Sequence, residues 1–225
     1  MARYSTDKGS TLNTDKALGA GGEGTVYTIV GQPNSVAKIY HAQRLTKALA
    51  DKVTAMVADP PDDESRNDPQ LKHVSIAWPE QVLFQNGKFV GYVMPKIPKS
   101  DDLYDLLQPQ QRAKQHPHAD HRMIYRTARN FATAMAAIHR KKYVIGDVNF
   151  KNALFTDQAL ITIVDCDSMQ VTDAKGTIHR CLVGLPEYTA PELQGADFGK
   201  VNRTTESDTF GLAVLIFQLL MQGFH

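Results

Sequence analysis

The chain has 225 residues and a formal net charge of +1, with 42% hydrophobic and 22% charged residues. This is the composition of an ordinary globular protein that is long enough for one large domain or two lobes. The balanced charge makes nucleic acid an unlikely partner, and the two cysteines, Cys166 and Cys181, form neither a metal-type pair nor a disulfide framework. A polar start and the lack of a run of roughly 18 apolar residues argue against secretion and membrane insertion, so we expect a cytoplasmic protein without a membrane partner.

The first part of the chain is predicted to be mainly β structure. Residues 24–30 and 36–40 are rich in β-branched and aromatic side chains, and residues 80–85 and 88–94 form a second pair of strands joined by Asn86-Gly87. Between the pairs, apolar residues at helical spacing predict a helix over residues 42–57, which stops before two prolines. Residues 62–70 are predicted to be a polar loop.

The second part is predicted to be mainly helical. Residues 108–120 read as a surface loop rich in Gln, His and Pro. Asp120 is expected to cap a long helix that runs to His139, with one apolar face formed by Ile124, Ala128, Phe131, Met135 and Ile138. A second helix is predicted over residues 205–221. This order of elements indicates an α+β fold with a β-rich lobe of residues 1–95 and a helical lobe of residues 96–225.

A glycine-rich turn, Gly19-Ala20-Gly21-Gly22-Glu23-Gly24, links two predicted strands. Glycines allow the backbone to approach phosphate oxygens closely. No Gly-Lys-Ser/Thr follows, and the turn leads into a strand, so neither a P-loop nor a dinucleotide-binding turn is favoured. A plain hairpin turn is the alternative, but the flanking Leu18 and Val26, with Lys38 on the following strand, favour a nucleotide site.

A second group of polar residues lies in the helical part. Asp147 and Asn152 are five residues apart, and Asp165 ends the apolar run of residues 161–164. A polar turn after a helix would explain the first two residues alone. A carboxylate at the end of a strand is well placed to hold Mg²⁺, which prefers oxygen ligands, and this favours phosphoryl transfer. Asp167 is either a second metal ligand or a solvated surface carboxylate, and we favour the surface role.

The order and spacing of these motifs, closed by Ala190-Pro191-Glu192, resemble the protein kinase fold. Gly-Asp-Val-Asn from residue 146 and Asp-Cys-Asp from residue 165 are similar to a bacterial branch of eukaryotic-like Ser/Thr protein kinases, over roughly residues 10–225. The resemblance implies a bilobal fold, with an antiparallel sheet and one helix in the N-lobe and a mostly helical C-lobe. Because such kinases continue with further helices, we expect a truncated catalytic domain.

The resemblance also implies roles for individual residues. Asp147 would act on the attacking hydroxyl, Lys151 would supply charge near the transferred phosphoryl group, and Lys38 would pair with the α- and β-phosphates. Asn152 and Asp165 would hold Mg²⁺, and Asp208 would anchor the catalytic loop from beneath. The implied ATP contacts are Leu18, Gly19, Gly21, Gly24, Val26, Ala37, Lys38, Met94, Pro95, Ile97 and Leu154.

The chain departs from the kinase pattern in three places. The helix predicted over residues 42–57 has no glutamate to hold Lys38, and Asp51 is its only carboxylate. Ile145-Gly146 replaces the usual His-Arg, and Leu185 replaces a threonine. The missing glutamate, Leu185 and the truncation favour a nucleotide-binding pseudokinase, whereas the presence of the residues Lys38, Asp147, Asn152 and Asp165 favours an active protein Ser/Thr kinase. We expect the kinase, with the pseudokinase as the alternative and a small-molecule kinase as a weaker one. Besides ATP and a protein substrate, the resemblance implies phosphatase and von Willebrand-type partner proteins.

Overall fold

The computed structural model describes residues 2–223 and divides into two compact units. The first comprises the described residues up to Pro60, Ala77–Ile97 and Asp173–Lys175, and the second comprises Pro61–Ile76, Pro98–Thr172 and the described residues from Gly176. The first unit is rich in strands and the second is mainly helical, which confirms the predicted fold class. Residues 61–76, assigned to the first lobe from the sequence, group with the second unit.

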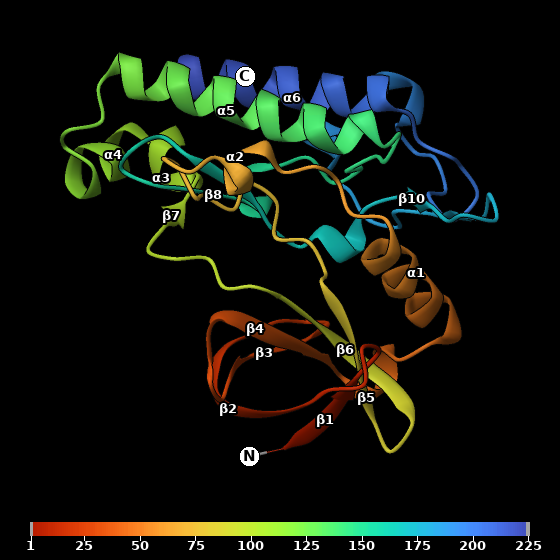
Figure 1. Cartoon of the computed structure of the whole chain (residues 1–225). Coiled ribbons are helices and arrows are strands. Elements are labelled where there is room, and N and C mark those ends of the chain that lie inside the picture. The colour runs from red at the N-terminus through yellow and green to blue at the C-terminus, as the bar shows by residue number, and fades with distance from the viewer. Residues whose placement is uncertain (1, 224–225) are drawn as a thin grey trace. The chain divides into compact units, whose positions relative to one another are not determined.

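The first unit is built on a closed antiparallel barrel with the strand order β1-β2-β3-β4-β6-β5 (Figure 1). An antiparallel sheet is predicted from the sequence, but the strand before the glycine-rich turn is given no bounds there and β1 is not predicted. The barrel closes because β1 pairs with both β2 and β5, which leaves no free edge. The strands are β1 (Arg3–Thr6), β2 (Thr11–Ala20), β3 (Gly24–Ile29), β4 (Gln32–Tyr40), β5 (Gln81–Gln85) and β6 (Lys88–Pro95).

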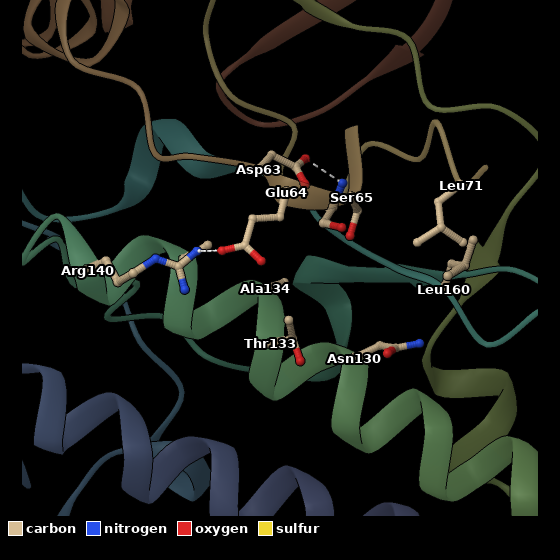
Figure 2. A pocket seen from close by; sticks show the side chains of 11 residues that line it. Asp63, Glu64, Ser65, Leu71, Asn130, Thr133, Ala134, Arg140 and Leu160 are labelled. Carbon is tan, nitrogen blue, oxygen red and sulfur yellow. Dashed lines mark hydrogen bonds and ion pairs between the residues drawn. The ribbon is translucent and has the colours of Figure 1, made fainter. Parts of the chain in front are cut away.

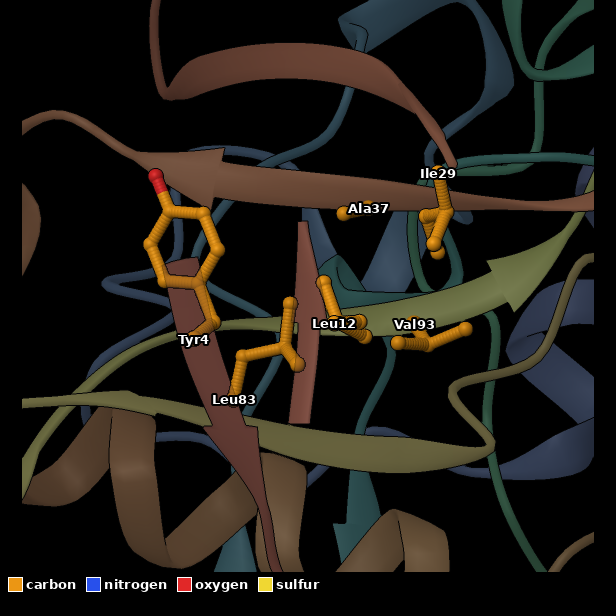
Figure 3. Close-up of a cluster of buried hydrophobic side chains, with 6 residues drawn as sticks. All are labelled: Tyr4, Leu12, Ile29, Ala37, Leu83 and Val93. Atoms are coloured by element: carbon orange, nitrogen blue, oxygen red, sulfur yellow. The ribbon is translucent and has the colours of Figure 1, made fainter. Parts of the chain in front are cut away.

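Apolar side chains fill the barrel and supply the burial that stabilises it. Figure 3 shows this core, whose buried members come from all six strands: Tyr4, Leu12, Ile29, Ala37, Leu83 and Val93. The hairpin between β5 and β6 turns through Asn86 and Gly87, with φ values of 52° and 75°. Positive φ at both central residues is the conformation that an Asn-Gly turn favours, so this predicted hairpin is confirmed.

One α-helix, α1 (Lys47–Ala58), packs against β5 and β6. The prediction that it begins at residue 42 is wrong, because Thr46 is the N-cap: its side-chain oxygen accepts a hydrogen bond from the Leu49 N–H at 3.1 Å. The preceding residues, Ala42–Arg44, form only a 3₁₀ turn. Val53 and Met56 are fully buried on the inner face of the helix.

Two helices that lie side by side form the frame of the second unit, α5 (His121–Arg140) and α6 (Thr205–Leu220) (Figure 1). The side chain of Asp120 caps α5 by accepting from the Met123 N–H at 2.9 Å, and the predicted apolar face of this helix is buried. Thr204 caps α6 in the same way through the Ser207 N–H. Both helices therefore confirm the sequence-based prediction.

The rest of the second unit consists of short elements. The prediction of a surface loop over residues 108–120 is wrong, since α4 begins there with a proline at a position where its missing N–H costs nothing. The helices are α2 (Glu64–Asn67), α3 (Tyr104–Leu107) and α4 (Pro109–Gln115), and 3₁₀ turns cover Phe150–Asn152, Cys166–Ser168, Pro186–Tyr188 and Pro191–Leu193. The strands are β7 (Asp101–Asp102), β8 (Ala153–Phe155) and β9 (Ile161–Ile163) in one sheet, with β10 (Val171–Thr172) and β11 (Ile178–His179) in another.

The segment of residues 61–76 is held to α5 by a salt bridge of 2.8 Å between Glu64 and Arg140 (Figure 2). The Asp63 carboxylate accepts from the backbone N–H groups of Ser75 and Ile76 at 2.7 and 3.2 Å. A shallow pocket lies beside these contacts, and none of the predicted phosphate or metal residues lines it. Among the described residues, no helix is both long enough and apolar enough to cross a membrane.

Candidate active site

A loop in the second unit holds the Asp147 carboxylate in a fixed orientation. The Asn152 side-chain amide donates to Asp147 Oδ2 at 3.0 Å and to the Asp147 carbonyl at 2.9 Å. Asn149 is buried, donates to the same carbonyl at 3.0 Å, and accepts from the Lys151 N–H at 2.8 Å. The other carboxylate oxygen of Asp147, Oδ1, is buried and has no hydrogen-bond partner among the described residues. A buried carboxylate oxygen with an unused acceptor site needs an explanation, and a hydroxyl bound beside it would supply the missing hydrogen bond.

Asp208, near the start of α6, holds the beginning of this loop from below. Its Oδ2 accepts from the Ile145 N–H at 2.6 Å and from His139 Nε2 at 2.9 Å, and its Oδ1 accepts from the Gly146 N–H at 2.8 Å. The carboxylate is only 2% exposed, so these three donors replace its hydration. The helix itself is capped by Thr204, and Asp208 therefore serves the loop.

Asp165 follows β9 in a left-handed backbone conformation, with φ of 54° and ψ of 38°. Few residues other than glycine adopt this conformation, and such strain is concentrated at functional sites. The Asp165 carbonyl accepts from the N–H and the hydroxyl of Ser168 at 3.1 and 2.9 Å, and its side chain is exposed. Asp167 is 4% exposed, so its prediction as a solvated surface carboxylate is wrong.

Arg203 ties this loop to the segment around Cys181, a role that no sequence motif reveals. Its guanidinium donates to the Gly146 carbonyl and, at 2.6 Å, to the Val183 carbonyl, and it stacks on Phe198 with 3.7 Å to the ring centre. Gly146 has a φ of +74°, and a Cβ there would lie 2.7 Å from Arg203 Nη1. The glycine that replaces the usual arginine thus makes room for an arginine from another part of the chain.

Tyr188 lies after Cys181 and Val183 in the chain and connects this segment to α6. Its hydroxyl donates to Gln218 Oε1 at 2.6 Å, and burial raises the pKa of Tyr188 to about 12. The phenol therefore stays protonated at neutral pH and acts as a hydrogen-bond donor to α6.

In the first unit, Lys38 lies on β4 and is 6% exposed. Its ammonium is 3.6 Å from the Glu23 carboxylate and lies over the rings of Tyr40 and Tyr92 at 5.6 and 5.9 Å. Asp51, which the sequence suggests as the partner, instead pairs with Lys47 at 2.6 Å. A carboxylate from the glycine-rich turn therefore lies beside Lys38.

The strand register shows which side chains share a face with Lys38. Val26 on β3 pairs with Lys38, and Met94 on β6 pairs with Val36. Directly paired residues project from the same face, and side chains along one strand alternate, so Val26, Val36 and Met94 accompany Lys38. Ala37 projects into the barrel core and does not lie on this face. Because side chains alternate along a strand, counting two residues back from Lys38 gives Val36 as the neighbour on the same face.

The glycine-rich turn leaves its backbone accessible. A Cβ added at Gly19, Gly21 or Gly22 would meet nothing within 4 Å, whereas one at Gly24 would lie 2.9 Å from Tyr40 Cα. The first three glycines therefore leave space for a ligand, and the fourth permits close packing of β3 on β4.

The remaining predicted contacts are divided between the two units. In the first, Leu18 on β2 is 53% exposed, Pro95 ends β6 as a buried residue, and Ile97 follows it half-buried. In the second, Leu154 lies half-buried on β8, and Lys151 is exposed next to the Phe150 ring. Of the predicted residues in the second unit, Asp147 and Asn152 contact each other directly, through the hydrogen bond between their side chains.

Known proteins with similar sequences are kinases. Two Escherichia coli proteins, from strain K12 and from O157:H7, are both named protein kinase YegI and are 35% identical over 223 residues, which is 98% of this chain and 33% of each relative. The chain thus spans about a third of the length of these curated relatives. The Drosophila melanogaster serine/threonine-protein kinase Genghis Khan is 32% identical over 89 residues, or 39% of this chain and 5% of that protein.

The fold has a counterpart among solved structures. The ROP18 kinase domain in complex with AMP-PNP and sucrose superposes with a TM-score of 0.64 over 96% of this chain and 66% of that one. Its sequence identity of 15% makes this a likeness of fold alone. Residues 12–224 match the protein kinase domain family, and the chain therefore belongs to that family.

Proposed function

We propose that this chain is the catalytic domain of an active Ser/Thr protein kinase, which transfers the γ-phosphoryl group of ATP to hydroxyl groups of proteins. The observation that carries the proposal is the state of Asp147: one carboxylate oxygen is fixed by Asn152, and the other is buried without a partner among the described residues. An oriented carboxylate that can accept a hydroxyl proton is what this reaction requires of the protein.

ATP and Mg²⁺ fit the residues present. Asn152 and Asp165 offer an amide oxygen and a carboxylate, the hard ligands that Mg²⁺ prefers, and the metal would neutralise charge on the phosphates. In the first unit, Lys38 would pair with phosphate oxygens, and the open backbone at Gly19, Gly21 and Gly22 would let the phosphates approach. Lys151 is exposed, lies four residues after Asp147, and would add positive charge near the transferred phosphoryl group.

For the adenine, the register of the barrel supports a changed set of contacts. The face of Lys38 also carries Val26, Val36 and Met94. We therefore assign to Val36 the adenine contact that the family resemblance implies for Ala37. The backbone at Pro95 and Ile97 would supply hydrogen bonds, and Leu18 and Leu154 would add apolar contacts, as the family resemblance implies.

Three features favour the pseudokinase alternative: the helix without a glutamate, Leu185 in place of a threonine, and the expected truncation. Because Glu23 lies 3.6 Å from Lys38, a carboxylate is available to orient the lysine, and the first of these features gives the alternative less support. The decisive experiment is mass spectrometry after incubation with Mg-ATP and a mixed protein substrate. Phosphoserine or phosphothreonine above the level of an Asp147→Asn control supports the proposal, and phosphotyrosine alone would correct its specificity. ATP binding without transfer would identify a pseudokinase.

Mg-ATP is expected to raise the melting temperature of the protein. A ligand that binds only the folded state stabilises it by about 2.7 kcal/mol at 100 times its Kd. Lys38→Met should reduce this shift, whereas the matched variant Lys47→Met, an exposed lysine on α1, should keep it. A thermal-shift titration up to millimolar nucleotide measures both, and a flat wild-type curve would contradict the proposal.

We also expect activity without phosphorylation of the segment that contains Thr172 and Thr177. Kinases that need this phosphate hold it with the arginine that Gly146 replaces here. Arg203 already links Gly146 to Val183 through direct hydrogen bonds. Phosphatase-treated and untreated enzyme should therefore phosphorylate an external substrate at equal rates. A large loss after treatment, reproduced by Thr172→Ala or Thr177→Ala, would contradict this expectation and direct attention to Arg180 as the phosphate ligand.

A further inference from the structure

Three side chains with metal-binding atoms meet at a place in the second unit that the proposed kinase reaction does not use. His116 and His118 follow α4, and Asp157 lies in the turn after β8. One ligand atom from each lies within 4.8 Å of the others. His118 Nε2 is 3.2 Å from Asp157 Oδ1, and His116 Nδ1 is 3.8 Å from the same oxygen.

These separations are close to those of ligand atoms around one ion. With zinc–ligand bonds of 2.0–2.1 Å in a tetrahedron, neighbouring ligand atoms lie about 3.3 Å apart. The His118–Asp157 distance already matches this value, and the His116–Asp157 distance exceeds it by about 0.5 Å. The ligand atoms of His116 and His118 lie within 4.8 Å of each other. His118 and Asp157 are 51% and 59% exposed at the side chain, so both can adjust.

His116 is buried, and its two ring nitrogens face different carboxylates, Nδ1 towards Asp157 and Nε2 towards Asp101. The residue is 5% exposed, and its Nε2 is buried without a hydrogen-bond partner in the described part of the chain. Buried imidazole nitrogens are nearly always satisfied, so this atom needs an explanation. Nε2 faces Asp101 Oδ2 at 3.9 Å. A histidine that binds metal through Nδ1 carries its proton on Nε2 and donates it to a carboxylate, which is the common arrangement at zinc sites.

The surrounding structure holds these groups in place. The His116 ring packs edge-on against Phe155, with 4.8 Å between ring centres, and Asp101 lies opposite Phe155 in the β7–β8 pairing. The turn that carries Asp157 is closed by a hydrogen bond of 3.0 Å from the Thr156 N–H to the Leu160 carbonyl. The cluster therefore sits on a small sheet and the capped end of α4.

The local charge favours a cation. Burial and the neighbouring Asp102 carboxylate raise the pKa of the Asp105 carboxyl, and His116 lowers it. A divalent ion would offset this concentration of carboxylates.

We propose that His116, His118 and Asp157 bind one divalent transition-metal ion of the zinc class, with Asp101 as the carboxylate that orients His116. Imidazole suits zinc, whereas Mg²⁺ prefers oxygen ligands alone, so this site is chemically distinct from the nucleotide's metal. The ion joins the segment after α4 to the β8–β9 turn, and its role is to stabilise the second unit.

The test is isothermal titration of ZnCl₂ into chelator-treated protein without nucleotide, with Co²⁺ absorption to report the ligand geometry. Wild type should bind one ion per chain and melt at a higher temperature with zinc. His118→Gln and Asp157→Asn change exposed side chains and should each weaken binding by about tenfold or more, and Asp101→Asn should weaken it by about tenfold. His121→Gln, an exposed histidine on α5, is the matched control and should bind as wild type.

The result does not depend on kinase activity, since Asp165→Ala should bind zinc as wild type does. If His116→Gln fails to fold, the exposed variants still decide the question. The proposal would be overturned if the wild-type protein did not bind one zinc ion per chain. Equal affinity in wild type, His118→Gln and Asp157→Asn would overturn it as well.

Discussion

Replacement of Asp147 by asparagine is expected to lower kcat by a factor of about 10²–10⁴, the usual contribution of a positioned acid or base. The substitution keeps the shape of the side chain but removes the carboxylate whose Oδ1 is free to accept a proton. Nucleotide affinity should survive, because Asp147 acts on the attacking hydroxyl. Asp165→Ala should also abolish transfer, but it should in addition lower Mg²⁺-dependent ATP affinity, since we propose that this carboxylate holds the metal.

Single-turnover kinetics and ATP titrations with and without Mg²⁺ separate these two effects. Asp197→Asn is the control, because Asp197 is an exposed aspartate whose salt bridge with Lys200 lies on the surface. It should leave rate and affinity unchanged. Full activity in Asp147→Asn, or unchanged Mg²⁺-dependent affinity in Asp165→Ala, would refute the corresponding role.

Asp208→Ala is expected to cause the largest loss of stability among these variants. The change removes the acceptor of the Ile145 and Gly146 N–H groups and of His139, all at 2.6–2.9 Å. A buried donor left without a partner costs about 1–3 kcal/mol, so the free energy of unfolding should fall by about 3 kcal/mol or more. Activity should fall too, because the loop that carries Asp147 loses its support.

Urea unfolding of the second unit measures this change, with Glu206→Gln as the matched control. Glu206 lies two residues before Asp208 on α6 but is exposed, so its loss of charge should change the free energy of unfolding far less than Asp208→Ala does. The stability of Asp208→Asn should lie between those of Asp208→Ala and Glu206→Gln, because an amide oxygen can accept some of the same hydrogen bonds. A stable Asp208→Ala variant with an intact rate would show that the loop needs no anchor.

The elements predicted correctly from the sequence have strong local signals. The apolar stripe and the Asp120 cap define α5, and Asn86-Gly87 defines a hairpin turn. By contrast, β2 buries only Leu12 and Thr14 among ten residues, so its sequence has no apolar alternation to detect. The helix α4 is hidden by a Gln- and Pro-rich composition that is typical of loops.

The residues of the candidate site also separate into those that the sequence predicts and those that only the structure reveals. Asp147, Asn152 and Asp165 are found from motif spacing, because each lies in a short loop whose neighbours in sequence form a recognisable pattern. Glu23 and Arg203 were not predictable, since their partners Lys38 and Gly146 lie 15 and 57 residues away and only tertiary folding brings them together. The prediction for Ala37 follows the letters of a motif and neglects the alternation of side chains along a strand, which places Ala37 in the barrel core and Val36 on the face of Lys38.

The closed barrel has a consequence for how the chain folds as it is made. Ser5 on β1 and Phe84 on β5 pair across 79 residues, so the last seam of the barrel is a distant contact that forms only after the intervening chain exists. At about 5–20 residues per second, a ribosome needs roughly 4–16 s to make that stretch. During this interval the nascent β1–β2 hairpin exposes an unpaired strand edge, the kind of surface that chaperones protect.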